Sequence, residues 1–275
     1  SNGLGFNGNN YFSVNIDSKN FVAWCWKAGG AAVTNNDGNI TSSVSVNKEA
    51  GFSIAKYTGS TSSGALTVGH GLGKKPAMVI IRRTDDGADW IIGHKGLATN
   101  AFANNKFLKF DTGTTGTNSL VFGAEPTTTV TQITTNGAGG ATNLTSSGTY
   151  VMYSWAETPG FSKMGVYKGN GNADGTFVHL GFRPAWIMLK RTDNTSGAQW
   201  LILDNKRNPT NIVNRNIYAN TNNDDGTIDR CDFLSNGFKI KNNGTTINTS
   251  GGTYIYMAIA EQPGLTPYMA PTNAR

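Results

Sequence analysis

The chain has 275 residues, of which 37% are hydrophobic and only 15% are charged, and its formal net charge is +6. The charged share is below the roughly 25% of ordinary soluble domains, and Asn, Thr, Ser and Gly supply the missing polarity. Because these residues form helices poorly, the composition argues against a helical protein and favours strands joined by tight turns. The sequence holds no run of 18 or more apolar residues, which argues against a transmembrane helix.

The basic residues are scattered along the chain. They form doublets only at Lys74-Lys75, Arg82-Arg83 and Lys190-Arg191, each beside a predicted strand. A nucleic-acid interface needs basic residues clustered on one face or stripe. We therefore expect solvated basic residues and no nucleic-acid partner.

The two cysteines, Cys25 and Cys231, lie far apart in apolar or mixed contexts. Two cysteines do not make a disulfide framework, and no Cys-x-x-Cys pair is present. We expect two free and mostly buried thiols.

The first predicted elements lie before residue 51. The apolar stretch 21–26 resembles the strand that closes each later unit, so residues 1–27 are expected to be the C-terminal hairpin of a preceding, partial unit. Residues 28–50 are rich in Gly, Ala, Asn and Ser, which is typical of a linker.

The rest of the chain is a duplication. Its matched segments are 51–59 with 160–169, 71–85 with 181–193, 90–94 with 200–204, and 148–160 with 252–264. The copies begin 109 residues apart, which is the size of one sandwich domain. We predict two tandem antiparallel β-sandwich repeats of jelly-roll or lectin-like type, over 51–159 and 160–264, followed by a C-terminal tail over 265–275.

Two segments, 77–81 and 185–189, are apolar on both faces and should be central strands that are covered from both sides. Asn-Gly and Asp-Gly pairs, such as Asn236-Gly237, predict hairpin turns. The best candidate for a short helix is 209–218.

Three histidines raise the possibility of a metal site. His70 and His179 occupy equivalent places in the two repeats, so they should lie in separate units, and His94 is matched by Asp204. This arrangement does not gather ligands around one ion. We expect structural or surface histidines.

Carboxylates cluster in two turns, at Asp85, Asp86 and Asp89 and again at Asp224, Asp225 and Asp229. Aspartates in such turns bond their own backbone, although calcium binding in a loop and glycosidase catalysis are alternatives.

Glu157 and Glu261 end the closing segments of both repeats. Their repetition predicts a hydrogen bond or salt bridge that fixes the exit of the strand.

The sequence contains no Gly-x-Ser-x-Gly elbow, no His-Glu-x-x-His and no paired nucleophile and base. The glycine-rich stretch 69–74 leads into a strand, whereas a phosphate-binding loop needs a following helix. We therefore expect no catalytic, cofactor-binding or metal-ligating residue, no cofactor and no enzymatic activity. Four aromatic residues could stack on sugars, although packing is the simpler expectation: Tyr11, Phe12, Tyr218 and Tyr268.

Several segments resemble a family of virion proteins from tailed phages of marine bacteria, of the cyanophage and pelagiphage type. These segments are 23–30, 36–42, 50–54, 68–73, 169–175, 181–184, 232–239 and 251–258. The resemblance covers nearly the whole chain from residue 20 onward. It implies a structural particle protein, often labelled a tail fibre, in the region that follows a lectin-like sandwich domain. The tail at 265–275 departs from the family, whose members tend to end sooner.

We therefore expect a tail-fibre or appendage module on the virion surface that attaches the particle to its host. Expected partners are other virion proteins, further copies of the chain, with a trimer favoured, and a host cell-surface glycan, without membrane insertion. The alternatives are a decoration protein of the capsid or tail that only coats or stabilises the particle, and a glycan depolymerase.

Overall fold

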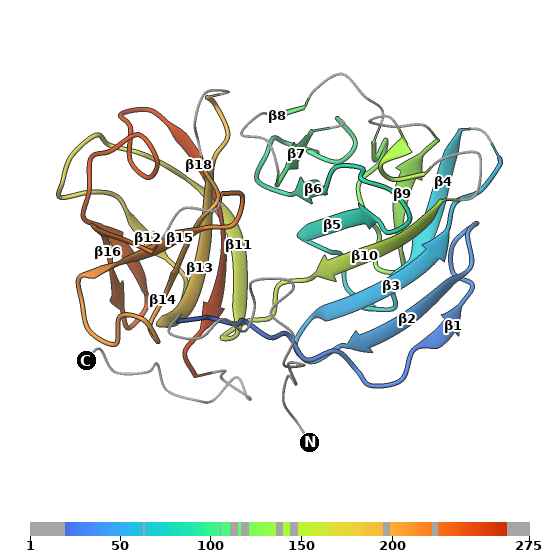
Figure 1. Ribbon diagram of the computed structural model, residues 1–275, viewed down its shortest axis with the longest axis horizontal. Helices are drawn as coiled ribbons and strands as arrows, with labels where there is room; N and C mark the ends of the chain where they lie inside the picture. The colour runs from blue at the N-terminus through green and yellow to red at the C-terminus, as the bar shows by residue number, and fades with distance from the viewer. Residues whose placement is uncertain are drawn as a thin grey trace.

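The structure is a computed structural model, and it describes residues 20–62, 64–104, 106–110, 115–116, 121–135, 140–143, 148–194, 199–221 and 225–262. These residues form strands, turns and extended segments and contain no α-helix. Two antiparallel β units lie side by side (Figure 1). The all-β class with two tandem sandwich units is thereby confirmed.

The first unit has a large and a small layer. Across the large, 8-stranded layer the strands are β1 (Val33–Asn35), β2 (Ser42–Asn47), β3 (Phe52–Thr58), β10 (Thr149–Trp155), β5 (Met78–Arg83), β6 (Ile91–His94), β7 (Phe107–Lys109) and β8 (Thr115–Gly116). The small layer pairs β4 (Ala65–Gly69) with β9 (Val130–Thr134). Val68 and Ile133 from the small layer and Val79 and Ile81 from the large one belong to one buried core.

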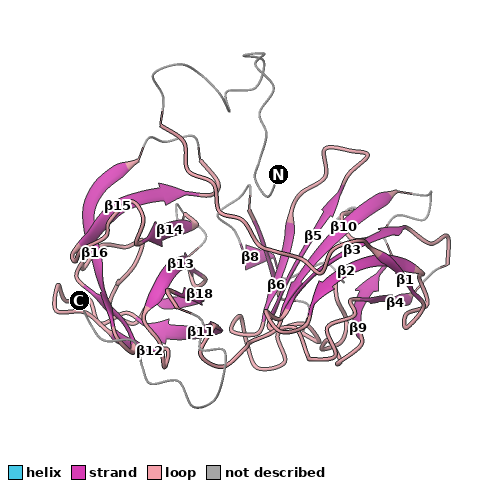
Figure 2. Cartoon of the chain, turned by 90° about the horizontal axis from the view of Figure 1, so that it is seen from below, coloured by secondary structure: helices cyan, strands magenta, loops and turns pink. Residues whose placement is uncertain are grey.

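The second unit is one 8-stranded sheet (Figure 2). Its strands are, in order, β11 (Ser162–Lys168), β18 (Thr253–Ala260), β13 (Pro184–Arg191), β14 (Leu201–Asp204), β15 (Val213–Tyr218), β16 (Gly226–Leu234), β17 (Gly237–Ile240) and β12 (Phe177–His179). Ile187 and Leu203 from its first half share a core with Phe238 and Ile240 from its second half. The turn at Ser235 and Asn236 joins β16 to β17, as the Asn-Gly signal predicts.

Matched side-chain contacts show how closely the two units correspond. Tyr57 stacks on Tyr150 and Tyr167 stacks on Tyr254, and in both pairs the ring centroids are 5.0 Å apart and the planes differ by 11°. Each of the four hydroxyls donates to a backbone carbonyl at 2.6–2.8 Å. The duplicated sequence therefore forms the same buried contacts twice.

The Tyr167 hydroxyl offers a direct test of these contacts. It donates to the carbonyl of Ile247 at 2.7 Å in a buried setting. We expect Tyr167→Phe to lower the free energy of unfolding by about 1–3 kcal/mol, because the carbonyl loses its partner. Urea unfolding measures this loss, and the equivalent Tyr57→Phe should give a similar value. A loss below about 0.5 kcal/mol in both variants would contradict the assignment.

The Thr-Asp segments of the two units are also equivalent. Asp85 accepts the backbone N–H of Thr149 at 3.0 Å, and Asp193 accepts that of Thr253 at 3.0 Å. Each aspartate pairs with the arginine two residues before it. These bonds tie the end of β5 to β10 in the first unit and the end of β13 to β18 in the second.

The two doubly apolar segments are central strands, as predicted. β5 lies between β10 and β6, and β13 lies between β18 and β14. In β5, Val79 and Ile81 face the core of the first unit, whereas Met78 and Ile80 belong to a third core. That third core lies between the units, so each central strand is buried on one face by its own unit and on the other by the neighbouring unit.

The expectation of a linker over 28–50 is wrong. β1 and β2 lie there, and β2 pairs with β3 over six residues from Ser42 to Asn47. Val44 is buried in the first core. Alternating Ser and Val at 43–46 supplies a strand pattern that the polar composition of the segment concealed.

Residues 21–26 are also not the closing strand of a preceding unit. The described part of this segment is extended but lies outside every sheet. Its even-numbered residues from Val22 to Ala28 are half-buried and its odd-numbered residues are exposed. The alternation predicted from the sequence is present. The segment uses it to bury side chains between the two units, and it does not pair with a strand.

The helix expected over 209–218 is absent, because residues 213–218 form β15. Val213 is buried and Ile217 pairs with Ile202 of β14. Val213 and Ile217 lie four residues apart, a spacing that fits a helix as well as a strand, and the ladders that β15 forms with β14 and β16 decide for the strand.

Candidate functional site

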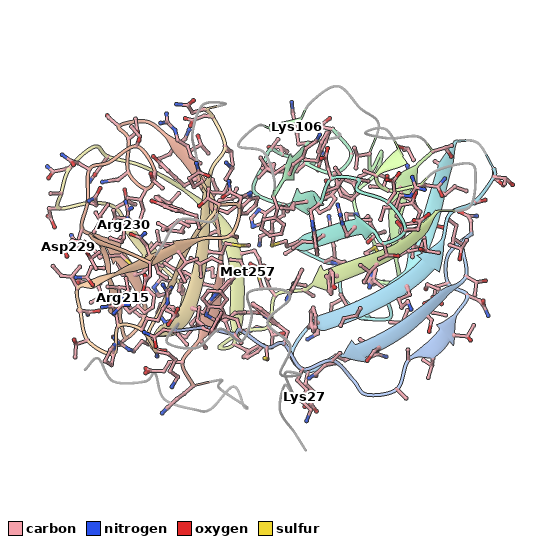
Figure 3. The ribbon with its side chains drawn as sticks, in the orientation of Figure 1. Lys27, Lys106, Arg215, Asp229, Arg230 and Met257 are labelled. Carbon is pink, nitrogen blue, oxygen red and sulfur yellow. The ribbon has the colours of Figure 1, made fainter. Side chains whose placement is uncertain are left out.

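An aromatic cleft of about 370 Å³ opens between the two units. It is lined by Trp24, Trp26, Phe52, Ile54, Ile80, Trp90, Phe110, Tyr153, Trp155, Trp186, Met188, Ile202, Ala219 and Met257. Met257 lies on the face of the second unit that is turned toward the first (Figure 3). The volume is within the range of small-ligand pockets, and a mainly apolar lining is typical of them.

Strand periodicity positions the cleft residues of the first unit. Tyr153 and Trp155 are two residues apart on β10, so they point to the same face of the sheet. Tyr153 pairs with Ile80 of β5 and with Ile54 of β3. These residues line the cleft because the opposite face of the same strands fills the core of the unit.

The rings form a continuous series of contacts. Trp90 and Tyr153 are nearly parallel, with centroids 6.4 Å apart and an angle of 16°, and Tyr153 and Trp155 are 6.2 Å apart at 26°. Trp26 makes edge contacts at 6.3 Å to Trp155 and at 5.3 Å to Trp186 of the second unit. The N-terminal segment thereby bridges the two units.

Two indole nitrogens in this region, those of Trp155 and Trp186, are buried and have no hydrogen-bond partner among the residues that the structure describes. A buried donor without an acceptor costs about 1–3 kcal/mol. A second hollow of about 480 Å³ is also lined by these two indoles and Trp26.

Three cations lie over tryptophan rings around the cleft. The distances to the ring centroids are 5.5 Å for Arg82 over Trp90, 6.0 Å for Lys190 over Trp200 and 5.7 Å for Arg207 over Trp24. Contacts of this kind contribute roughly 0.5–2 kcal/mol each. Lys190 is fully buried, and burial lowers its pKa to about 8.

Polar contacts also join the units beside the cleft. Nε2 of His94 donates to the carbonyl of Tyr256 at 3.1 Å, and its Nδ1 accepts the backbone N–H of Gly96 at 3.0 Å. The indole of Trp200 donates to the carbonyl of Lys109 at 3.0 Å. Burial lowers the pKa of His94 to about 4, so the ring is neutral in this contact.

The three histidines do not come together. His70 is buried, with Nδ1 accepting the N–H of Leu72 at 3.2 Å, and burial lowers its pKa to about 4. His179 is exposed at the end of β12, so the two histidines predicted as equivalent differ in environment. Within the described part of the chain, no group of three potential metal-ligating side chains exists.

The acidic turns have structural contacts. Asp85 binds Arg83 and the backbone of β10, and these hydrogen bonds hold the pKa of Asp85 well below its usual range. Asp86 accepts the N–H of Gly87 at 2.6 Å, which is the turn chemistry predicted for this cluster. Asp225 pairs with Arg207 and Arg215, and Asp224 lies outside the described residues.

The two glutamates at the strand exits behave as predicted. Glu157 binds Lys95 at 2.5 Å and also accepts the N–H of Met164 at 2.9 Å. Glu261 binds Arg183 at 3.0 Å and the side chain of Asn205 at 2.9 Å.

Of the four aromatic residues named from the sequence, Tyr218 is the one within the described residues, and it does not line the cleft. Tyr218 packs against the core of the second unit, and its hydroxyl accepts a hydrogen bond from Arg230 at 2.9 Å. Tyr11, Phe12 and Tyr268 lie outside the described residues. The available signal was the spacing of two between aromatic residues at 24 and 26 and at 153 and 155.

Cys231 is free and buried, as predicted, and burial raises the pKa of its thiol. Cys25 is free but exposed, because the alternation of the N-terminal segment turns its neighbours Trp24 and Trp26 inward. None of the described segments forms a helix long and apolar enough to cross a membrane.

The fold and the cleft define a class: a tandem β-sandwich protein whose two units share an apolar core that opens into an aromatic cleft. The chain belongs to the family DUF7483, a domain of unknown function, whose model matches residues 1–263. Comparisons with curated proteins and with solved structures found no match.

Proposed function

We propose that this chain is a non-enzymatic structural protein on the surface of a phage particle, a tail-fibre or appendage module that attaches the particle to its host. The observation that carries the proposal is the open aromatic cleft between two rigidly packed units. Half-buried aromatic rings such as Trp90 and Tyr153 on fixed strands provide a preformed surface for a ligand. The resemblance of the sequence to phage virion proteins supplies the setting.

The attachment function is favoured over decoration of the particle because a coat protein needs contacts only with its neighbours. An apolar recess that keeps Trp24, Trp90 and Tyr153 partly accessible is unfavourable unless something binds there. Asp89, the neighbour of Trp90 in the chain, is paired with Lys109.

The proposal includes a homo-oligomer, with a trimer favoured, together with other virion proteins as partners. Simple extension of the second sheet is disfavoured at its β11 edge. The N–H of Met164 is bound by Glu157 at 2.9 Å and the carbonyl of Lys168 by Thr176 at 2.7 Å. Side chains that occupy an edge in this way oppose strand addition, so copies would join through other surfaces.

Retention of the labelled chain on cells of a marine host bacterium and on its purified surface polysaccharide tests the proposal. We expect saturable binding to both, and weaker binding after Trp90→Ala, which removes one wall of the cleft. Binding only to assembled particles would favour the decoration protein. A fall in the viscosity of the polysaccharide would instead indicate a depolymerase.

A further inference from the structure

We propose that the corner of the cleft formed by Arg82, Trp90 and Tyr153 binds a pyranose that carries a carboxylate, such as a uronic acid of an acidic polysaccharide. The inference rests on the proposed attachment function and names the class of its ligand. It follows from two independent features of the corner, a pair of aromatic rings and an arginine that has no anionic partner among the residues the structure describes.

The aromatic feature is the pair Trp90 and Tyr153. Their planes differ by 16°, their centroids are 6.4 Å apart, and both side chains are half-buried in the lining of the cleft. Tyr153 is fixed on β10, and Phe110 supports Trp90 by an edge contact at 6.2 Å. Aromatic rings with an apolar body and a wet rim suit the C–H face of a sugar, whose hydroxyls remain in solvent.

The charged feature is Arg82. It follows Ile80 by two residues on β5, so both side chains point to the cleft face, and its guanidinium lies 5.5 Å from the centroid of Trp90. The other arginines that the structure describes bind carboxylates or side-chain oxygens: Arg83, Arg183, Arg191, Arg207, Arg215 and Arg230. Arg82 alone in this set has neither an ion pair nor a hydrogen bond.

The guanidinium of Arg82 is half-buried and already oriented by the ring of Trp90, which favours binding of a planar anion. Arginine binds a carboxylate through two parallel N–H bonds, and partial desolvation strengthens the pair. The ring that holds Arg82 is the ring on which the sugar would stack. One ligand residue could thus contact Trp90 through its C–H face and Arg82 through its carboxylate.

The charges around the corner favour a sparsely charged glycan over a nucleic acid. Lys109 is paired with Asp89, and Arg207 is paired with Asp204 and Asp225. Single-stranded nucleic acids need a basic groove that follows successive phosphates. Arg82, which has no ion pair with a described residue, matches a polymer with separated carboxylates, and the net charge of +6 assists its approach.

The second unit contains an equivalent cation–ring pair, which is not accessible to solvent. Lys190 lies 6.0 Å from the centroid of Trp200, but both side chains are fully buried between the units. Duplication therefore produced two cation–ring pairs, and packing leaves only the pair of the first unit accessible. We expect one binding site for each chain.

Calorimetric titration with trigalacturonate, and with its carboxyl-reduced neutral form, tests this site. We expect the wild type to prefer trigalacturonate, and Arg82→Gln to bind it about tenfold more weakly while leaving the neutral form unaffected. Trp90→Ala should weaken binding of both oligosaccharides. Arg215→Gln is the matched control, because Arg215 is salt-bridged on the outer part of the second unit (Figure 3) and its loss removes the same charge.

Several outcomes would overturn the assignment. Equal binding of trigalacturonate by wild type and Arg82→Gln would exclude the arginine, and tighter Arg82-dependent binding of an oligothymidylate would indicate a nucleic-acid site. Arg82→Lys and thermal unfolding of each variant separate a local effect from misfolding. Host-cell retention that is unchanged in Arg82→Gln leaves attachment intact and removes the uronate site. If uronate binding depends on Arg82 but the chain is not retained on host cells, the uronate site stands and the attachment function is excluded.

Discussion

Replacing Trp200 with alanine is expected to lower the free energy of unfolding by about 3–5 kcal/mol. The side chain is 1% exposed, and its ring centroid lies 5.0 Å from that of Phe110 in the first unit. Its indole N–H donates to the carbonyl of Lys109 at 3.0 Å. Its removal creates a cavity in the shared core and leaves that carbonyl without a partner. Urea denaturation followed by circular dichroism measures the loss.

Trp90→Ala is the matched control, because Trp90 occupies the equivalent place in the first unit. It is only half-buried and makes no hydrogen bond to the described residues of the other unit, so its removal should cost about 1–2 kcal/mol. We also expect Trp200→Ala to unfold in two steps, because the shared core is what couples the units. Equal losses in the two variants would show that the units are not held together as described.

Stability is expected to fall as the pH is lowered from about 6.5 to 4. Burial lowers the pKa values of His70 and His94 to about 4, whereas an unfolded histidine titrates near 6.5. Between these values the unfolded chain binds more protons than the native chain, so the stability present above pH 6.5 is lost toward pH 4. Each histidine contributes about 3 kcal/mol to this loss.

Urea unfolding at pH 7, 5.5 and 4 measures the effect, and His94→Asn separates the two contributions. The equivalent residue, Asp204, accepts the backbone N–H of Lys206 two residues on at 3.0 Å, just as His94 accepts that of Gly96. Asparagine can therefore retain this bond without titrating in the window. We expect about half of the pH dependence to remain, and an unchanged slope would exclude His94 as a source.

The carboxylates affect a lower range of pH. Asp85, Asp174 and Asp193 have pKa values below their usual range because of hydrogen bonds and ion pairs with neighbouring basic side chains and, for Asp85 and Asp193, backbone N–H groups. Their stabilising contribution is lost only as the pH falls below about 4. The window from 6.5 to 4 therefore reports on the histidines.

Repetition in the sequence was the most reliable guide to the fold. The matched tyrosines, the Thr-Asp segments and the doubly apolar strands all form equivalent structures in both units. The predictions that were wrong concern segments whose local pattern fits two different structures. The alternation at 21–26 fits a ladder strand and a wedge between units equally well, and the polar segment 28–50 concealed β2.

By itself the sequence determined the class of backbone, the two-fold repeat and the identity of the central strands, because these depend on composition and on short periodicity. Only the tertiary structure decided that the outer faces of both sheets pack together, that Trp24 and Trp26 fill the seam between them, and that Arg82 has no anionic partner among the described residues. Those features depend on side chains far apart in the chain. Their proximity is fixed by how two complete units dock, which no local pattern encodes.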